Sequence, residues 1–166
     1  MTSDPMADLG SLLVPINDSG ASREALSVAC ELVRRGKGRR VLAVHVIEVP
    51  RRLPLDAEMI EELENGERIL EHAESMGRRQ RIEITADLVQ AREAGTAIVD
   101  EARERGVDAL VIGIDYHRPH GTFQLGRLPR YALEHAPCQV WLIRYPPEPR
   151  PDGSPEPGRD GGDGNG

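Results

Sequence analysis

Five short apolar segments, separated by stretches with helical periodicity, constrain the fold of this chain more than any other feature. Each segment has the length of a β-strand, and residues that favour turns follow it. The predicted strands are residues 12–16, 41–49, 82–89, 109–112 and 139–144. Because helical stretches rather than hairpin turns connect them, we expect these strands to lie parallel in one sheet with helices on both faces.

Capping residues and glycines set the boundaries of the predicted helices. A Ser, Thr or Asp side chain accepts a hydrogen bond from the first helical turn, and glycine often follows the last turn. The predicted helix starts are, in chain order, Ser19 or Ser22, Asp56, Thr96 and Gly126. The predicted ends of the first three helices are Gly36 with Gly38, Met76 and Gly106.

The sequence indicates one domain between two terminal segments. A chain of 166 residues is long enough for a single domain with a substantial core. Residues 10–145 carry the predicted strands and helices, and residues 1–9 are expected to be a flexible N-terminus. Residues 146–166 are almost all Pro, Gly, Ser or charged residues, which cannot bury enough apolar surface to fold, so we expect a disordered tail.

Charge and composition exclude several classes of partner. The net charge is −7 and only 3% of the residues are aromatic, so neither a basic surface nor a stacking surface for nucleic acid is expected. No apolar run reaches the roughly 18 residues that a membrane span needs. The N-terminus does not resemble a secretory signal, and two cysteines give no disulfide framework. We therefore expect a cytoplasmic protein with no nucleic-acid partner and no membrane span.

Two glycines mark the most informative turn of the chain. Gly113 leaves the fourth predicted strand and Gly126 opens the short last helix, an arrangement in which backbone N–H groups can face an anion. In an open parallel sheet, ligands bind beyond the carboxyl ends of the strands. We therefore expect the turns at these ends to converge on one crevice, namely residues 15–19, 45–48, 90–93 and 113–126.

Four segments, in this order and with matching gaps, resemble the universal stress protein family. They are VPINDSGAS (residues 14–22), VHVIEVP (44–50), DALVIG (108–113) and HAPCQVWLIR (135–144). The resemblance implies a flavodoxin-like or Rossmann-like three-layer α/β sandwich, with a five-stranded parallel sheet in the order 3-2-1-4-5. It also implies a homodimer that acts as a non-enzymatic cytoplasmic regulator of stress tolerance.

The last predicted strand, Gln139–Arg144, is apolar on both faces and would lie at an edge of that sheet. An exposed apolar edge tends to pair with another strand unless something covers it. The simplest cover is the same strand of a second copy, in a two-fold symmetric contact. In the alternative, Trp141 packs beneath a helix and the edge stays open.

The resemblance also implies a nucleotide site, with departures from the family pattern. Nucleotide-binding members carry Gly, two residues, Gly, nine residues, Gly and then Ser or Thr. Gly113 and Gly126 occupy the first and third glycine positions, whereas Tyr116 replaces the second glycine and Arg127 replaces the hydroxyl residue.

On the adenosine side of this implied site, one residue matches the family pattern and two depart from it. Asn17 takes the place of the aspartate that usually holds the ribose, Asp18 follows in a position that is usually glycine, and Val46 matches the residue whose backbone meets the adenine. The implied ligand is ATP, ADP, AMP or another phosphate-bearing small molecule. The residues implied to bind it are Pro15, Ile16, Asn17, Asp18, Val46, Ile112, Gly113, Tyr116, Gly126, Arg127 and Leu128.

The departures in the glycine motif leave two functions open. The ring of Tyr116 can fill the path of the phosphates, and Arg127 in the first turn of a helix opposes the helix dipole by about 0.3–1 kcal/mol. We therefore expect an anion beside Arg127, either a carboxylate such as Asp18, Asp115 or a glutamate, or a ligand phosphate. The chain is thus either a nucleotide-binding module or a ligand-free dimeric scaffold whose site Tyr116 and Arg127 plug.

Catalysis and metal binding are not expected. A slow nucleotide hydrolase would need a general base or metal-binding carboxylates near the γ-phosphate, and the sequence places none there. His117 and His120 lack a third metal ligand nearby and are expected to be solvated. His45 is expected to be a hydrogen-bonded core residue, and Cys138 a small apolar core residue.

Overall fold

A computed structural model of the chain describes residues 9–35, 40–116 and 121–146. The predictions for Gly36, Gly38, His117 and His120, and for nearly all of the two terminal segments, lie outside these residues. No helix within the described ranges is both long and apolar enough to cross a lipid bilayer.

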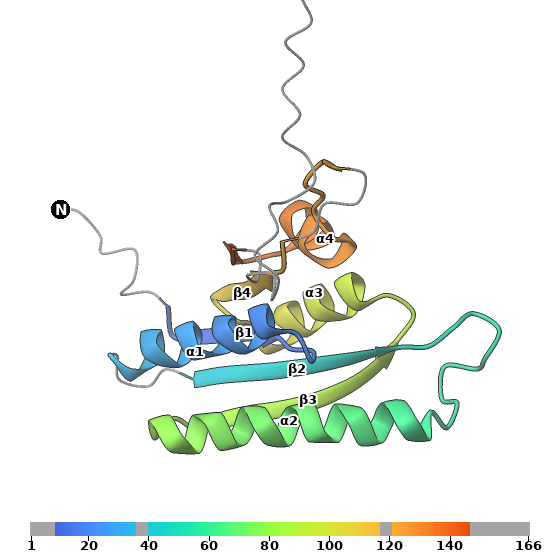
Figure 1. The fold of residues 1–166 in the computed structure, drawn as a ribbon, viewed down its shortest axis with the longest axis horizontal. Helices are drawn as coiled ribbons and strands as arrows, with labels where there is room; N and C mark the ends of the chain where they lie inside the picture. The colour runs from blue at the N-terminus through green and yellow to red at the C-terminus, as the bar shows by residue number, and fades with distance from the viewer. Residues whose placement is uncertain (1–8, 36–39, 117–120, 147–166) are drawn as a thin grey trace, which may run out of the picture.

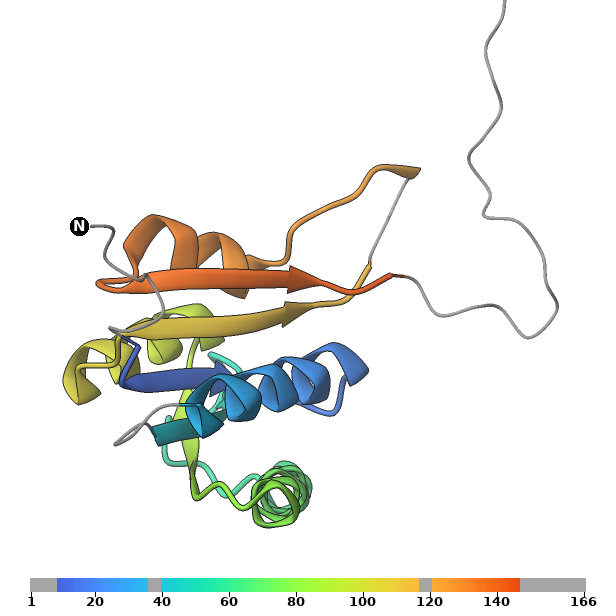
Figure 2. The ribbon, with the colours of Figure 1, turned by 90° about the vertical axis from the view of Figure 1, so that its left-hand side faces the viewer.

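Strands and helices alternate along the described chain, as the apolar pattern predicts. The elements are β1 (Ser11–Pro15), α1 (Gly20–Arg34), β2 (Arg40–Glu48), α2 (Ile60–Gln80), β3 (Ile84–Ala91), α3 (Ala94–Arg105), β4 (Ala109–Ile114), α4 (Arg127–His135) and β5 (Gln139–Arg144). Every pair of neighbouring strands is parallel, and the sheet order is β3-β2-β1-β4-β5 (Figure 1 for β1 to β4, Figure 2 for β5). The predicted topology is confirmed, and the carboxyl ends of all the strands lie along one edge of the sheet.

Helices cover both faces of the sheet and create two apolar cores. α1 and α2 pack on one face, and α3 and α4 pack on the other (Figure 2). Along β1, Leu12 and Val14 belong to the first core and Leu13 to the second. Because the central strands β1, β2 and β4 contribute to both cores, their sequences are continuous apolar runs rather than alternating ones.

Ser19, one of the two residues predicted to cap the first helix, is the N-cap residue of α1. Its Oγ accepts a hydrogen bond from the backbone N–H of Ser22 at 3.1 Å. Ser22 is buried in turn, and its hydroxyl donates to the backbone carbonyl of Asn17 at 2.9 Å. These two serines therefore fix both the start of α1 and the turn that leads into it.

The predicted helix start at Asp56 is wrong. α2 begins at Ile60, and its N-cap residue Met59 provides no side-chain hydrogen bond. The loop before α2 is held from the end of β3 instead, because Nη1 of Arg92 donates to three carbonyl oxygens of this loop. They belong to Val49, Pro50 and Leu53, at 3.2, 2.7 and 2.9 Å. A residue distant in the sequence therefore holds the loop that precedes α2.

The predicted start at Thr96 is also wrong, because α3 begins at Ala94. The earlier start accompanies close packing against α4, since a Cβ atom on Gly95 would lie only 2.9 Å from Cβ of Tyr131. The first turn of α3 is thus shaped by a neighbouring helix rather than by a cap. The predicted end at Gly106 is confirmed, and this glycine adopts the left-handed conformation with φ of 58°.

α2 extends to Gln80, beyond its predicted end at Met76, and β3 consequently begins at Ile84 rather than at Ile82. The N–H of Ile82 donates to the carbonyl of Gly77 at 2.9 Å, which closes the helix with Arg81 in a left-handed conformation. Such a closure normally uses glycine at that position, so the sequence carries no local signal for it.

The first core residue is Leu9, which is 1% exposed, although residues 1–9 are predicted to be a flexible terminus. The side chain of Asp108 holds this end of the chain. Its Oδ2 accepts hydrogen bonds from the backbone N–H groups of Gly10 and Ser11, both at 2.8 Å. Because Asp108 immediately precedes β4, this carboxylate connects the beginning of β1 to the beginning of β4.

Replacing Asp108 with alanine is expected to lower the free energy of unfolding by about 1.5–3 kcal/mol, because two backbone N–H groups lose an ionised acceptor. Urea denaturation followed by circular dichroism measures the change. Asp56→Ala is the control, since Asp56 is exposed and has no hydrogen bond or ion pair with any residue in the described ranges. An Asp108→Ala protein as stable as this control would contradict the role given to Asp108.

Candidate functional site

The carboxyl ends of β1, β2 and β4 meet the first turns of α3 and α4 around a cavity of about 300 Å³, which we call the strand-end cavity. Its lining residues are Pro15, Ile16, Asn17, Ser22, Val44, His45, Val46, Glu48, Ala94, Ile98, Ile112, Gly113, Leu128 and Pro129. The volume lies at the lower end of the range for small-molecule sites, and the position is where open parallel sheets bind ligands.

Many of the predicted ligand-binding residues line this cavity. They are Pro15, Ile16, Asn17, Val46, Ile112, Gly113 and Leu128. The turns after β1, β2 and β4 therefore do converge, as the parallel sheet requires. Asp18, Tyr116, Gly126 and Arg127 are not among the lining residues.

The predicted convergence of residues 90–93 on the same crevice is wrong, because β3 is an edge strand of the sheet. Nε2 of Gln90 donates to the carbonyl oxygens of Leu55 and Ala57, at 3.4 and 3.1 Å. Glu93 lines a neighbouring cavity instead. The end of β3 thus supports the loop before α2 rather than the strand-end cavity.

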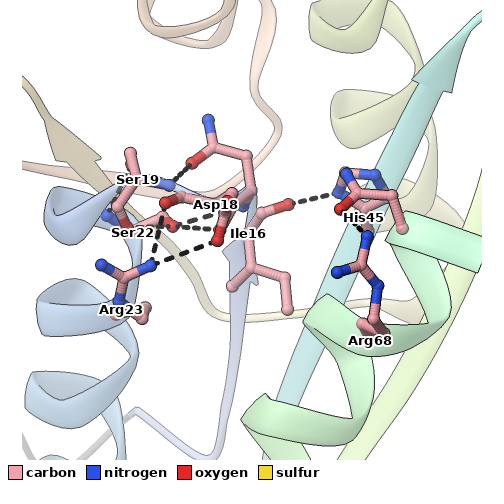
Figure 3. Close-up of polar contacts among 9 residues, drawn as sticks. Ile16, Asp18, Ser19, Ser22, Arg23, His45 and Arg68 are labelled. Atoms are coloured by element: carbon pink, nitrogen blue, oxygen red, sulfur yellow. Dashed lines mark hydrogen bonds and ion pairs between the residues drawn. The ribbon is translucent and has the colours of Figure 1, made fainter. Parts of the chain in front are cut away.

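Asp18 forms an exposed ion pair with Arg23 on α1. Its carboxylate Oδ1 lies 3.4 Å from Nη1 of Arg23, and the same nitrogen donates to the backbone carbonyl of Asp18 at 2.8 Å (Figure 3). The side chain of Asp18 is 84% exposed. Its charge is therefore directed to a surface arginine and contributes little to the strand-end cavity.

The ring of Tyr116 lies against other side chains near the end of β5. It stacks on Phe123, with ring centroids 6.0 Å apart, and the guanidinium carbon of Arg144 lies 5.2 Å from its centroid. Since Tyr116 does not line the strand-end cavity, it does not fill that cavity in this structure.

Arg127 has a carboxylate of the protein beside it. Its Nη2 lies 3.7 Å from Oε2 of Glu48, so a glutamate supplies the expected anion. The side chain of Arg127 is 88% exposed, and solvent therefore screens the pair strongly. Arg127 lines a neighbouring cavity of about 240 Å³, which shares Glu48, Ala94 and Leu128 with the strand-end cavity.

Hydrogen bonds fix the polar groups where β1 ends. Oδ1 of Asn17 accepts the backbone N–H of Ser19 at 2.8 Å, and the N–H of Asn17 donates to Oγ of Ser22 at 3.2 Å. Nδ1 of His45, on β2, donates to the carbonyl of Ile16 at 2.8 Å (Figure 3). His45 is thus a half-buried, hydrogen-bonded residue that ties the end of β1 to β2.

Several lining residues were not among the predicted ligand-binding residues. They are Ser22, Val44, His45, Glu48, Ala94, Ile98 and Pro129. His45 and Glu48 were expected only as part of the turn after the second strand, and Ser22 only as a helix cap. Ala94 and Ile98 could not be found from the sequence, because their role depends on α3 beginning before its expected cap and lying across the strand ends.

Gly113 and Gly126 carry different constraints. A Cβ atom on Gly113 would lie 2.1 Å from the carbonyl oxygen of Ala21, so α1 can pack against β4 only when residue 113 is glycine. A Cβ atom on Gly126 would meet only Pro129, in an ordinary contact at 3.7 Å. Since φ of Gly126 is −63°, folding does not demand glycine at this position. The open space beside it allows a ligand to approach the backbone closely.

The start of α4 offers backbone N–H donors, a group that phosphate oxygens accept. The first turn of α4 leaves the N–H groups of Arg127 and Leu128 without acceptors inside the helix. No group of three or more His, Cys, Asp or Glu residues in the described ranges could hold a metal ion. Burial raises the pKa of the Cys30 thiol to about 11 and also raises the pKa of the Cys138 thiol, so burial favours the protonated form of both.

Residues 10–144 of the chain match the sequence model of the Universal stress protein family. None of the curated proteins matches it. Solved structures of several family members share the fold. A family protein from Burkholderia pseudomallei is 24% identical, with a TM-score of 0.63, over 85% of this chain and 98% of its own.

Two further similar structures contain nucleotides. The universal stress protein from Archaeoglobus fulgidus in complex with dAMP is 23% identical, with a TM-score of 0.64, over 82% of this chain and 98% of its own. A family protein from Arabidopsis thaliana with AMP bound is 20% identical, with a TM-score of 0.59, over 86% of this chain and 97% of its own. At these identities the likeness establishes the fold.

The two glycines are expected to respond differently to alanine. Gly113→Ala should lower the free energy of unfolding by about 2–3 kcal/mol, because α1 must move away from β4 to admit the methyl group. Gly126→Ala should cost at most about 1 kcal/mol, the difference between glycine and alanine at a helix N-cap. Urea denaturation of both variants measures the difference, and equal effects would contradict the packing role of Gly113.

Proposed function

The chain belongs to the universal stress protein family, and on this premise we propose that it is a cytoplasmic regulator of stress tolerance that binds an adenine nucleotide, or another phosphate-bearing small molecule, in the strand-end cavity. The observation that carries the proposal is the convergence of β1, β2 and β4 with the start of α4 on one cavity. The similar proteins from Archaeoglobus fulgidus and Arabidopsis thaliana hold dAMP and AMP.

The proposed phosphate position is the start of α4. Backbone N–H groups at a helix N-terminus bind phosphate oxygens directly and add the favourable end of the helix dipole. The side chain of Arg127 is exposed enough to turn from Glu48 to a bound phosphate, for which its planar guanidinium offers a fork of donors.

We propose that the protein acts by binding and not by turnover. Among the described lining residues, only His45 and Glu48 have ionisable side chains. Nδ1 of His45 is engaged with the carbonyl of Ile16, and Glu48 lies beside Arg127. Neither arrangement resembles a base poised to activate a water molecule next to a γ-phosphate.

The ligand-free scaffold remains the second candidate, and one observation favours it. The ion pair with Glu48 gives Arg127 a partner inside the protein, so its charge does not require a ligand. The position of Tyr116 outside the lining of the strand-end cavity argues against the plug that this candidate needs.

Adenine nucleotides are expected to raise the unfolding temperature, because a ligand at about 100 times its Kd stabilises the native state by about 2.7 kcal/mol. Scanning fluorimetry with AMP, ADP and ATP measures the shift. Ala94→Glu, in the first turn of α3, should lower the affinity at least tenfold more than Ala94→Gln does, because only the glutamate repels a phosphate.

Two results would count against this function. Wild-type protein that no nucleotide stabilises would favour the ligand-free scaffold. Phosphate release from ATP above the rate of the Ala94→Glu protein would instead indicate an enzyme.

We further propose a homodimer through the edge strand β5. Trp141 and Ile143 pack partly against one core, and Val140 and Leu142 against the other, which leaves the outer backbone edge of the strand to a partner. The N–H groups of Gln139 and Tyr145 donate to carbonyl oxygens on the β4 side, of Asp108 and Ile114. Because these groups alternate along a strand, the N–H of Arg144 faces outward.

Light scattering at micromolar concentration is expected to give twice the chain mass of 18.3 kDa. Arg144→Pro should weaken the dimer, because proline removes an N–H that only the partner strand can use. Arg144→Ala removes the same side chain but keeps the N–H, and it should leave the dimer intact. A monomeric wild-type protein would defeat this proposal.

A further inference from the structure

The neighbouring cavity adjoins the strand-end cavity, because Glu48, Ala94 and Leu128 line both. The neighbouring cavity measures about 240 Å³ and the strand-end cavity about 300 Å³. Sites that enclose a whole small molecule usually measure about 300–1,000 Å³, so one cavity is smaller than this range and the other lies at its lower limit. Their sizes and their shared residues favour one ligand with two parts over two separate ligands.

The proposed phosphate position lies between these two parts. Leu128, whose N–H group belongs to the first turn of α4, lines both cavities, and Arg127 lines the neighbouring one. A ligand that extends from the strand-end cavity past the start of α4 therefore enters the neighbouring cavity. A phosphate at this position would then link two moieties rather than end the ligand.

Three side chains that line the neighbouring cavity have polar groups without a partner. The hydroxyl of Thr96, the guanidinium of Arg130 and the carboxylate of Glu134 make no hydrogen bond or ion pair with any residue in the described ranges. The hydroxyl donates and accepts, the guanidinium only donates, and the ionised carboxylate only accepts. A polyol matches this set, because each of its hydroxyl groups can both donate and accept.

A chain of further phosphates matches the neighbouring cavity less well. Three glutamates and two arginines line it. Glu48 and Glu93 each lie beside an arginine, with N–O distances of 3.7 and 3.8 Å, and the charge of Arg130 balances that of Glu134. The described lining and its ion-pair partners therefore carry no net positive charge to attract a polyphosphate, whereas uncharged hydroxyl groups meet no repulsion there.

We propose that the ligand is a nucleoside diphosphate sugar, with its pyrophosphate link at the start of α4 and its terminal sugar in the neighbouring cavity. This inference rests on the proposed nucleotide function and narrows it. Glu134 accepts hydrogen bonds from the sugar hydroxyls, and Arg130 and Thr96 donate to them. Because hydrogen bonds to charged groups are the stronger ones, Glu134 and Arg130 determine the preference for a sugar.

Titration calorimetry with ADP-ribose, ADP-glucose and the β-methyl ester of ADP tests this assignment. All three compounds carry the same charge, so the terminal sugar is what distinguishes the first two from the ester. Wild-type protein is expected to bind at least one of the two sugar compounds about tenfold more tightly than the ester, because only a sugar reaches the polar groups of the neighbouring cavity.

Glu134→Ala removes the unpartnered carboxylate from the neighbouring cavity. It should weaken the preferred sugar compound about tenfold and change the affinity for the methyl ester less than twofold. Glu104→Ala is the matched control, since Glu104 is an exposed glutamate on α3 that lines neither cavity. It should leave the affinities for all three compounds unchanged.

The possible failures are distinguishable. Wild-type protein that binds the methyl ester as tightly as both sugar compounds overturns the sugar assignment and leaves the proposed nucleotide function standing. A folded Glu134→Ala protein with an unchanged preference for the sugar has the same consequence. Wild-type protein that binds none of these compounds, nor AMP, ADP or ATP, overturns both proposals. If Glu134→Ala fails to fold, the wild-type affinities alone decide.

Discussion

The close approach of α1 to the end of β4 is the contact on which the site depends. The carbonyl group of Ala21 occupies the space that a side chain at residue 113 would need, so the first turn of α1 lies directly against the strand. That position sets the short turn from β1, in which Asn17, Ser19 and Ser22 are hydrogen-bonded to one another. A glycine that resembles part of a phosphate motif therefore has a packing role that needs no ligand.

The topology was predictable because it depends on burial, and burial is visible in the sequence. Strands with a core on each side must be apolar throughout, as β1, β2 and β4 are, and crossover helices leave only parallel neighbours. Helix starts were less predictable. Ser19 caps α1 by a hydrogen bond to a residue three positions away, whereas Arg92 holds the loop before α2 and Tyr131 packs against the first turn of α3 from distant positions in the sequence. Asp56 and Thr96 are residues that often cap helices, but neither is the N-cap residue here, because contacts within the fold outweigh this local preference.

The residues of the candidate site that lie at strand ends were predictable, and those on helices were not. Asn17, Val46 and Gly113 follow or end apolar runs, so their convergence follows from the parallel sheet. The helical contributions were hidden, because Ala94 and Ile98 depend on where α3 lies. The effect of the motif departures was also hidden, since neighbouring side chains decide where the ring of Tyr116 and the guanidinium of Arg127 rest.

The hydrogen bonds from Arg92 to the loop after β2 have a consequence for the order in which the chain folds. β3 follows α2 in the sequence, yet its end carries the guanidinium that holds the three carbonyls before α2. During synthesis, α2 can form as soon as it leaves the ribosome, but the loop at residues 49–53 waits for Arg92, which has not yet been made. That loop should be the last part of this segment to become protected and the first to open when β3 detaches from β2.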